Sequence, residues 1–424
     1  MRRLSALVAL ALAVTSCSNG SQEASPFVGL WASEGFGTYM VIEGGNVDIF
    51  EHTSVSCGRT VRGTARGVSE VLRLDGDRLV LEDGGRLVRF DGIDVLPTHC
   101  ADDYFVEDAT ASFAILAATV EEHYVPGVDD GWDERRDRLA SGIVPDTDAP
   151  TLLGAFVELL TPLDDPQLQV APDESAGLGR GSWSVAIDPF LDSLADRIAT
   201  GTGLDPWTDD GDGAIVSGRL PGGAGYLAFT RFAAIDADPD ESEQIVLRAM
   251  DRLLDELEEE GAPGLVLDLR VAAGGVEGLA LLAATRFVPA ELALSERLVR
   301  VEGTDRFVDG GASIVRPDPT GIYEAPVVVL IGPGTFGAAE MLVTALSGVP
   351  SVTLLGEATA GTPSQPLIRV LPNTWAFGVP HQRVLVDGDP FQGAVEPDHV
   401  VEMDGTDLAE GRDPVLDAAA ALLP

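Results

Sequence analysis

Three kinds of hydrophobic pattern follow one another along the chain. Between residues 26 and 103, apolar and polar positions alternate in runs such as TYMVIEGGNVDIFE and VLRLDGDRLVLEDGGRLVRFDGI, with Gly-Gly and Asp-Gly turns between runs. This alternation predicts a small N-terminal all-β domain. Residues 104–175 carry apolar positions at helical spacing, which predicts a helical subdomain. In residues 176–424, β-rich apolar runs alternate with amphipathic segments, and this order predicts a parallel sheet covered by helices.

The clearest helix and strand signals lie in the third of these stretches. Apolar residues from Ile245 to Leu257 form one stripe that ends at Gly261, which predicts an amphipathic helix. The segments GLVLDLR at 264–270 and APVVVLIG at 325–332 are apolar and rich in residues that favour strands, as expected for buried parallel strands. The helical segments GLALLAATRFV and AAEMLVTALSG follow these two strands. We therefore expect an α/β fold in this part of the chain.

The amino-terminal segment departs from these patterns. Residues 1–17 begin with two arginines after the methionine, continue with an apolar run and end at Cys17, which suits a secretory signal peptide rather than a resident membrane helix. The end of this segment resembles a bacterial lipobox, which implies a lipid on Cys17; an ordinary signal peptide with a chance cysteine is the alternative. Residues 18–25 are polar and predict a tether. We expect an exported protein anchored by lipid to the outer face of the bacterial cytoplasmic membrane, or to the outer membrane or cell surface.

Export changes the interpretation of the other two cysteines, Cys57 and Cys100. Both lie within the predicted β domain, and an oxidising compartment favours a disulfide between them. Two distant cysteines supply too few ligands for a metal site. The acidic stretches 208–214 and 236–243 lack the glycine and glutamate spacing of an EF-hand loop. We therefore predict a disulfide, no metal site and no cofactor.

The charge of the chain narrows the choice of partners. Its net charge of -42 would repel nucleic acid and an anionic membrane surface, so no nucleic acid is expected to bind and the membrane is reached only through the lipid anchor. All 27 basic residues are arginines. A mechanism that uses a lysine base or a lysine Schiff base is therefore excluded.

The segment VLIGPGTFGAAEML at 329–342 reads as a strand, a glycine turn and a helix, and we call residues 332–337 the elbow turn. Acyl-transfer chemistry needs an exposed hydroxyl, a base within hydrogen-bond reach, and backbone N–H donors for the oxyanion. The start of the helix, at Ala338, is a candidate for one oxyanion or peptide-binding donor. A second is expected at Gly274 and Gly275, because glycine lets the backbone approach a ligand closely. On spacing alone, a plain strand-to-helix turn is an equally good interpretation of these two glycines.

Four segments in order resemble peptidase family S41, the tail-specific or C-terminal-processing serine peptidases. They are LTPLDDPQLQV, GLVLDLRVAAGGV, the segment at 329–342, and LLGEATAG followed by GVPHQRVLVDGDPFQGAVEPDHVVE. The resemblance covers nearly the whole chain after the tether, residues 26–403, and is closer to the lipid-anchored branch with a small β domain in front. It implies a ClpP/crotonase-like parallel-sheet core. The PDZ domain that members often carry is not expected, because the interval from Val170 to Gly225 is too short for one.

The family pattern, carried over residue by residue, meets substitutions at its catalytic positions. The elbow pattern Thr-x-Ser-Ala-x-Glu reads TFGAAE here, so Gly337 occupies the position of the nucleophilic serine. Branches that use a histidine base have it where this chain has Gln167, and branches that use a lysine have it near Thr362. The asparagine that usually follows the DLR segment is replaced by Ala272. Glycine and glutamine cannot form a nucleophile–base pair, and loss of a triad serine costs on the order of 10⁶-fold in turnover.

Other hydroxyl and imidazole groups are weak candidates for a replacement site. Thr335 fits a packing or capping role at the helix start, and Ser364 lies in the loop GTPSQP and would need a base. His381 and His399 fall in C-terminal strands that could line a cleft, yet a structural role is the simpler interpretation for each histidine. The other three are His52, His99 and His123.

These observations favour an exported, lipid-anchored S41-like protein that is catalytically inactive and binds or scaffolds an extended peptide or protein tail. Such binding needs backbone hydrogen bonds at a sheet edge but no nucleophile. One alternative is an active serine-type endopeptidase that cleaves exported proteins or their C-terminal tails through a non-standard site. Another is that the β domain at 26–103 binds a ligand and the large domain is only structural.

Overall fold

The computed structural model describes residues 26–64, 72–83, 86–101, 104–106, 108–165, 167–172, 183–184, 189–201, 203–211, 213–232, 239–272, 274–391 and 393–424. The expected signal peptide, Cys17 and the tether lie outside the described residues. The chain forms two compact units. Unit 1 contains the described residues up to Ser184 together with Glu296–Ser313 and Pro366–Leu385, and unit 2 contains those of Ala186–Ser295, Ile314–Gln365 and Val386–Pro424.

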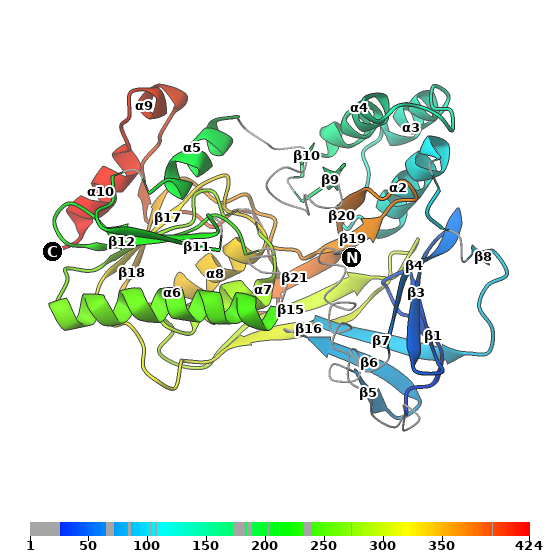
Figure 1. Cartoon of the computed structure of the whole chain (residues 1–424), viewed down its shortest axis with the longest axis horizontal. Helices are drawn as coiled ribbons and strands as arrows, with labels where there is room; N and C mark the ends of the chain where they lie inside the picture. The colour runs from blue at the N-terminus through cyan, green and yellow to red at the C-terminus, as the bar shows by residue number, and fades with distance from the viewer. Residues whose placement is uncertain are drawn as a thin grey trace. The chain divides into compact units, whose positions relative to one another are not determined.

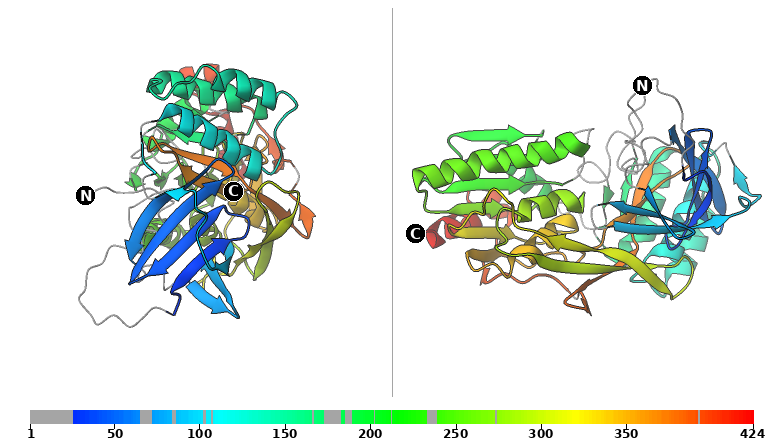
Figure 2. Two further views of the ribbon diagram at one scale, coloured as in Figure 1. Left: turned by 90° about the vertical axis from the view of Figure 1, so that its right-hand side faces the viewer. Right: turned by 90° about the horizontal axis from the view of Figure 1, so that it is seen from below.

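Unit 1 begins with an eight-stranded sheet of order β5-β6-β7-β1-β2-β3-β4-β8. The expected N-terminal all-β region is therefore confirmed, and the blue strands lie side by side in Figure 2. β2 and β3 meet at the Gly44-Gly45 turn, where both glycines have the positive φ that a tight hairpin needs. The strands are β1 (Gly29–Ser33), β2 (Thr38–Glu43), β3 (Asn46–Thr53), β4 (Ser56–Thr64), β5 (Leu72–Asp75), β6 (Arg78–Asp83), β7 (Arg86–Ile93) and β8 (Cys100–Ala101).

The predicted disulfide is present in this sheet. Cys57 on β4 and Cys100 on β8 pair in parallel register and are joined by an S–S bond of 2.06 Å. The bond closes a stretch of chain with a sequence separation of 43 residues. It therefore ties the last strand of the sheet to its neighbour.

Three helices in unit 1 follow the helical periodicity of the sequence. α2 and α4 each begin at an aspartate, Asp108 and Asp148, whose side chain accepts a hydrogen bond from a backbone N–H of the first turn. Their apolar faces share a core that includes Phe113 and Phe156. The elements are α2 (Ala109–His123), α3 (Trp132–Ala140), α4 (Ala149–Leu160) and the short 3₁₀ helix η3 (Thr161–Leu163).

Unit 1 is completed by strands from distant parts of the chain. One four-stranded sheet has the order β10-β9-β20-β19, and β15 pairs antiparallel with β21 from Glu296↔Leu385 to Val299↔Gln382. Leu371 and Phe377, from the second half of the chain, join the helix core of unit 1. These strands are β9 (Gln169–Ala171), β10 (Trp183–Ser184), β15 (Leu292–Arg300), β16 (Phe307–Val315), β19 (Pro366–Val370), β20 (Ala376–Pro380) and β21 (Gln382–Val386).

Unit 2 has a seven-stranded sheet of order β11-β12-β13-β14-β17-β18-β23 between two layers of helices. In Figure 1, α6, α7 and α8 lie on one face of this sheet and α5, α9 and α10 on the other. The strands of this sheet are β11 (Trp207–Asp210), β12 (Ile215–Arg219), β13 (Gly225–Phe229), β14 (Leu265–Asp268), β17 (Val327–Ile331), β18 (Val352–Gly356) and β23 (His399–Val400). The short strand β22 (Asp389–Pro390) also lies in unit 2 but is not part of this sheet. The helices are α5 (Pro189–Ala199), α6 (Pro239–Glu260), α7 (Glu277–Ala284), α8 (Ala338–Leu346), α9 (Gly405–Ala409) and α10 (Pro414–Leu422).

The centre of the unit 2 sheet is parallel, which confirms the expected α/β class. β13, β14, β17, β18 and β23 pair in parallel, while β11 and β12 add an antiparallel edge. All residues of β14 and β17 are buried, because helices cover both faces of these strands. In the part of the chain that the structure describes, no helix has both the length and the apolar character needed to cross a membrane.

Candidate active site

The elbow turn connects the end of β17 to the start of α8. Gly337 caps the helix with φ 60° and ψ −123°, a backbone conformation that residues with a Cβ rarely adopt. Its N–H donates to the carbonyl oxygen of Thr362 at 3.0 Å. The turn thus has a sharply bent, anchored backbone, and at Gly337 it presents no side chain.

Thr335 fixes the inside of the elbow turn. Its hydroxyl donates to the carbonyl oxygen of Leu269 at 2.8 Å and accepts the N–H of Gly332 at 3.1 Å. The residue is fully buried. This hydroxyl therefore holds the turn against the end of β14, and it is not exposed as a nucleophile would be.

The Gly274-Gly275 turn lies directly beside the elbow turn. A Cβ built on Gly274 would come within 3.4 Å of the carbonyl oxygen of Phe336, and both glycines have positive φ, 61° and 123°. The N–H of Gly274 already donates to the carbonyl oxygen of Ala272 at 2.9 Å. The structure thus brings together the two turns that the sequence singles out, and the positive φ of Gly274 and Gly275 is a backbone conformation that favours glycine.

Two backbone donors are left open at this junction. Within the described residues, the N–H groups of Gly275 and Ala338 have no hydrogen-bond acceptor. Ala338 is the first residue of α8, where N–H groups point out of the helix and the helix dipole favours negative charge. An oxygen of a peptide carbonyl or carboxylate is the kind of group that such donors bind.

Glu340 ties a loop to the first turn of α8. Its buried carboxylate accepts hydrogen bonds from the hydroxyl of Thr359, from the N–H of Gly361 at 2.6 Å and from the N–H of Thr362 at 2.7 Å. The hydroxyl of Thr362 is buried and, among the described residues, has no hydrogen-bond partner. Thr362 is therefore held in place through its backbone N–H, and its side chain is neutral.

Burial raises the pKa of Glu340 from 4.5 to about 7, although the three hydrogen bonds to its carboxylate act in the opposite direction. Since this pKa is higher in the folded than in the unfolded chain, folding takes up a proton between the two values. The stability that the protonated Glu340 contributes to the fold is fully present below about pH 4.5, and it is lost as the pH rises through about 7.

A Glu340→Gln variant should lose this pH dependence. We expect the unfolding free energy of the unmodified protein to fall by about 3 kcal/mol more than that of the variant between pH 4.5 and 7.5. Urea unfolding at several pH values measures the difference. Other buried carboxyls, such as Asp165, titrate in both proteins and cancel in the comparison. Parallel pH profiles for the two proteins would contradict the assignment.

A buried ionic cluster supports the end of β14 next to the elbow turn. The Arg270 guanidinium donates to both carboxylate oxygens of Asp268, at 3.0 and 2.6 Å, and to both of Asp413, at 2.8 and 2.9 Å. Tyr226 donates its hydroxyl to Asp268 at 2.8 Å. A Cβ on Gly334 would lie 2.4 Å from the carbonyl oxygen of Arg270, so this strand end contacts the elbow turn closely.

Gln167, which the sequence analysis singled out, belongs to unit 1. It is 3% exposed, and its N–H donates to the carboxylate of Asp165 at 2.9 Å. Asp165 also accepts the Tyr124 hydroxyl at 3.3 Å, and burial raises its pKa to about 6. The segment around Gln167 is therefore a buried, hydrogen-bonded turn of its own unit.

The remaining candidate side chains occupy varied settings. Ser364 is 8% exposed and its hydroxyl donates to the carbonyl oxygen of Gln365 at 3.3 Å. His399 is the one histidine in the sequence of unit 2, and it is exposed on β23 at the edge of the sheet. His123 and His381 are buried in unit 1. His52 and His99 face each other with ring centroids 5.6 Å apart.

Glu340 and the Arg270 cluster are the parts of the site to which the sequence analysis gave no role. A glutamate within the small and apolar residues GAAEML is a signal of a buried carboxylate, because charged groups are buried only with partners. The partner of Arg270 could not be found locally, since Asp413 lies 143 residues away in sequence.

Comparison with known proteins agrees with this fold. Residues 223–401, which include β14, both glycine turns, the elbow turn and α8, match the sequence model of Peptidase family S41. This part of the chain is therefore similar to peptidase family S41.

Three similar proteins can be compared with this chain. Carboxy-terminal processing protease CtpA of Bacillus subtilis (strain 168) is 32% identical over 108 residues, which are 26% of this chain and 22% of CtpA, so the match spans about a fifth of that relative's length. A candidate peptidase of Parabacteroides merdae covers 75% of this chain and 97% of its own, with a TM-score of 0.56 at 19% identity, which shows a shared fold. A lipoprotein of Streptococcus agalactiae covers 78% of this chain and 99% of its own at 14% identity, with a TM-score of 0.45 that is too low to carry an argument.

Proposed function

We propose that this protein is an exported, lipid-anchored member of the S41 family that binds an extended peptide or protein tail without cleaving it. The observation that carries the proposal is Gly337, which caps α8 at the elbow turn and has only a hydrogen where the family has its nucleophile. The anchor would be a lipid on Cys17.

The proposed lack of hydrolysis rests on the surroundings of Gly337 as well. The nearest hydroxyl along the chain, on Thr335, is buried and hydrogen-bonded inside the turn. The lysine position holds Thr362, and the sequence contains no lysine. With neither nucleophile nor base, turnover would fall by a factor on the order of 10⁶ relative to an intact serine peptidase.

The proposed binding rests on the open N–H groups of Gly275 and Ala338. Hydrogen bonds from these groups to a carbonyl or terminal carboxylate would fix one end of an extended peptide. Val276, which is 49% exposed, follows Gly275 and offers an apolar contact for a side chain of that peptide. The name of the relative CtpA describes carboxy-terminal processing, so a protein tail is the class of ligand to test first.

Incubation with a reduced, carboxymethylated unfolded protein and with a fluorophosphonate probe tests whether the protein lacks peptidase activity, as proposed. We expect binding of the unfolded protein, no cleavage, and no labelling, with an intact serine peptidase as the positive control. Cleavage or labelling that disappears in a Ser364→Ala variant would establish the alternative of a working peptidase with a non-standard site, and would end the proposal.

An Ala338→Pro variant tests whether the N–H of Ala338 contributes to peptide binding, as proposed. Proline removes one N–H donor at the first position of a helix, where it is tolerated, so the fold should be kept while peptide binding weakens roughly fivefold. Isothermal titration with peptides from the same unfolded protein measures this change. Binding that is unaffected in this variant, and is instead abolished when residues 26–103 are deleted, would move the ligand site to the β domain.

A further inference from the structure

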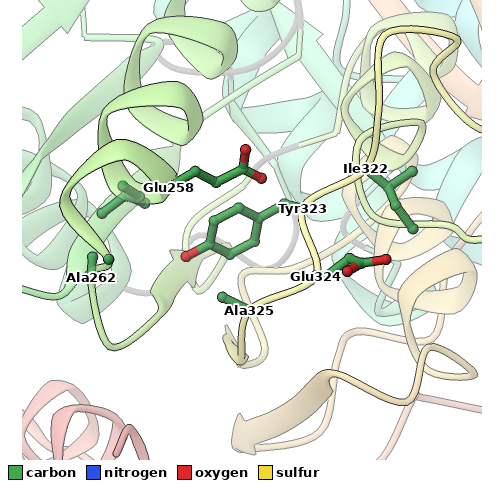
Figure 3. A pocket seen from close by; sticks show the side chains of 8 residues that line it. Glu258, Ala262, Ile322, Tyr323, Glu324 and Ala325 are labelled. Carbon is green, nitrogen blue, oxygen red and sulfur yellow. The ribbon is translucent and has the colours of Figure 1, made fainter.

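A hollow of unit 2 lies at the end of the sheet opposite the elbow turn. It has a volume of about 470 Å³ and is bordered by the end of α6 and by the segment that leads into β17. β14 and β17 pair in parallel from Leu265↔Val327 onward, so the hollow faces their amino-terminal ends while the elbow turn follows the carboxyl end of β17. We call it the Tyr323 pocket; it is lined by Leu257, Glu258, Gly261, Ala262, Ile322, Tyr323, Glu324 and Ala325 (Figure 3).

Tyr323 is the buried polar group of this pocket. The residue is 1% exposed, and its hydroxyl has no hydrogen-bond partner among the residues that the structure covers. Its N–H donates to the carbonyl oxygen of Arg286 at 2.7 Å, and its ring packs edge-on against Phe287. Figure 3 shows the hydroxyl pointing across the pocket toward Ala262. A fixed, buried hydroxyl without a partner is unusual and indicates a missing hydrogen-bonding group.

The charge around Tyr323 is negative. The carboxylates of Glu258 and Glu324 have no ion-pair partner within the described part of the chain. Arg219, the cation of this region, is already paired with Glu260 at 2.7 Å. The pocket also adjoins the carboxyl end of α6, which carries the negative end of the helix dipole. Burial and the charge of Glu258 raise the pKa of Tyr323 to about 12, so its hydroxyl keeps its proton.

These features select one chemical class of ligand. An anion would be repelled by the carboxylates and by the helix end. A metal ion would need several close ligands, and the described residues contain no group of three carboxylate, histidine or cysteine side chains that could hold one. An organic cation fits better, because its N–H groups can reach ligands that are spread apart while Leu257 and Ile322 contact an alkyl stem.

We propose that the Tyr323 pocket binds a primary alkylammonium group, with the Tyr323 hydroxyl accepting one N–H and the carboxylates of Glu258 and Glu324 providing the opposite charge. The chain has no lysine, so the group must come from another molecule. Its source is either a free di- or polyamine or a lysine side chain of a protein. Because the hydroxyl is covered when the pocket is empty, binding requires a small adjustment of residues 322–325.

Titration calorimetry at low ionic strength tests this proposal with three probes: 1,5-diaminopentane, a short lysine-containing peptide, and the same peptide with an acetylated lysine. We expect at least one of the first two to bind, and the acetylated peptide not to bind. Binding of the free diamine alone identifies a small-molecule source, and binding of the lysine peptide alone identifies a protein source. Failure of both to bind at millimolar concentration would overturn the proposal.

Variants distinguish binding in the Tyr323 pocket from nonspecific attraction of an amine to an acidic protein. Tyr323→Phe should weaken binding roughly fivefold and Glu258→Gln roughly tenfold, whereas Glu256→Gln, the same charge change elsewhere on α6, should change it less than twofold. Tyr323→Phe should unfold at the same or a higher temperature than the unmodified protein, because it removes a hydroxyl without a partner. Equal effects of Glu258→Gln and Glu256→Gln would show that the amine binds only the acidic surface, and the proposal would be wrong.

Discussion

Replacing Arg270 with methionine should lower the free energy of unfolding by about 3–5 kcal/mol. Arg270, Asp268 and Asp413 are all less than a tenth exposed, and the guanidinium makes two-pronged hydrogen bonds to both carboxylates. Without it, two carboxylates would remain buried with no cation between them, and such charges are costly in a medium of low dielectric constant. Urea unfolding followed by tryptophan fluorescence measures the loss.

The chain offers a matched control on α6. Arg248 pairs with Glu241 at 2.6 Å, but both side chains are about half exposed, so Arg248→Met should cost less than about 1 kcal/mol. Similar, small effects of the two substitutions would show that the Arg270 cluster contributes little. A triple variant with Arg270→Met, Asp268→Asn and Asp413→Asn should recover part of the loss, because it removes the uncompensated charges.

Removal of the disulfide is expected to have a similarly large effect on unit 1. The bond between Cys57 and Cys100 spans 43 residues, and closing a loop of that length restricts the unfolded chain by about 4 kcal/mol in the entropic description. A double Cys57→Ser, Cys100→Ser variant should therefore unfold at a much lower urea concentration. We expect the unmodified protein to shift toward the variant when a reductant is added.

The variant itself should not respond to the reductant, which serves as the control. A loss below 1 kcal/mol would show that the sheet holds β8 in place without the bond. Unfolding of unit 1 is best followed by far-ultraviolet circular dichroism, because the strands of its first sheet contribute directly to that signal.

Local patterns predicted the elements that pack against their sequence neighbours. The strands read from GLVLDLR and APVVVLIG appear as β14 and β17, since four or five consecutive apolar residues suit a strand buried on both faces. The helix with the stripe from Ile245 to Leu257 appears as α6, but it begins at Pro239, before the first residue of that stripe. Proline at the first helical position explains this earlier start.

Contacts between distant segments could not be read in the same way. Nothing in residues 296–299 reveals that they pair with 382–385, because any strand of suitable alternation could take that place. The site shows the same limit. The sequence identified Gly337 and the Gly274-Gly275 turn through local spacing, whereas the three donors to Glu340 come from a loop about twenty residues further along the chain.

The unusual backbone angles at Gly337 also determine what a side chain at this position would cost. Any residue with a Cβ would have to accept φ near 60° and ψ near −123° there, at a cost on the order of 1–3 kcal/mol. Glycine adopts these angles freely. A Gly337→Ser substitution would therefore introduce conformational strain together with a hydroxyl, and the chain with glycine at this position avoids that strain.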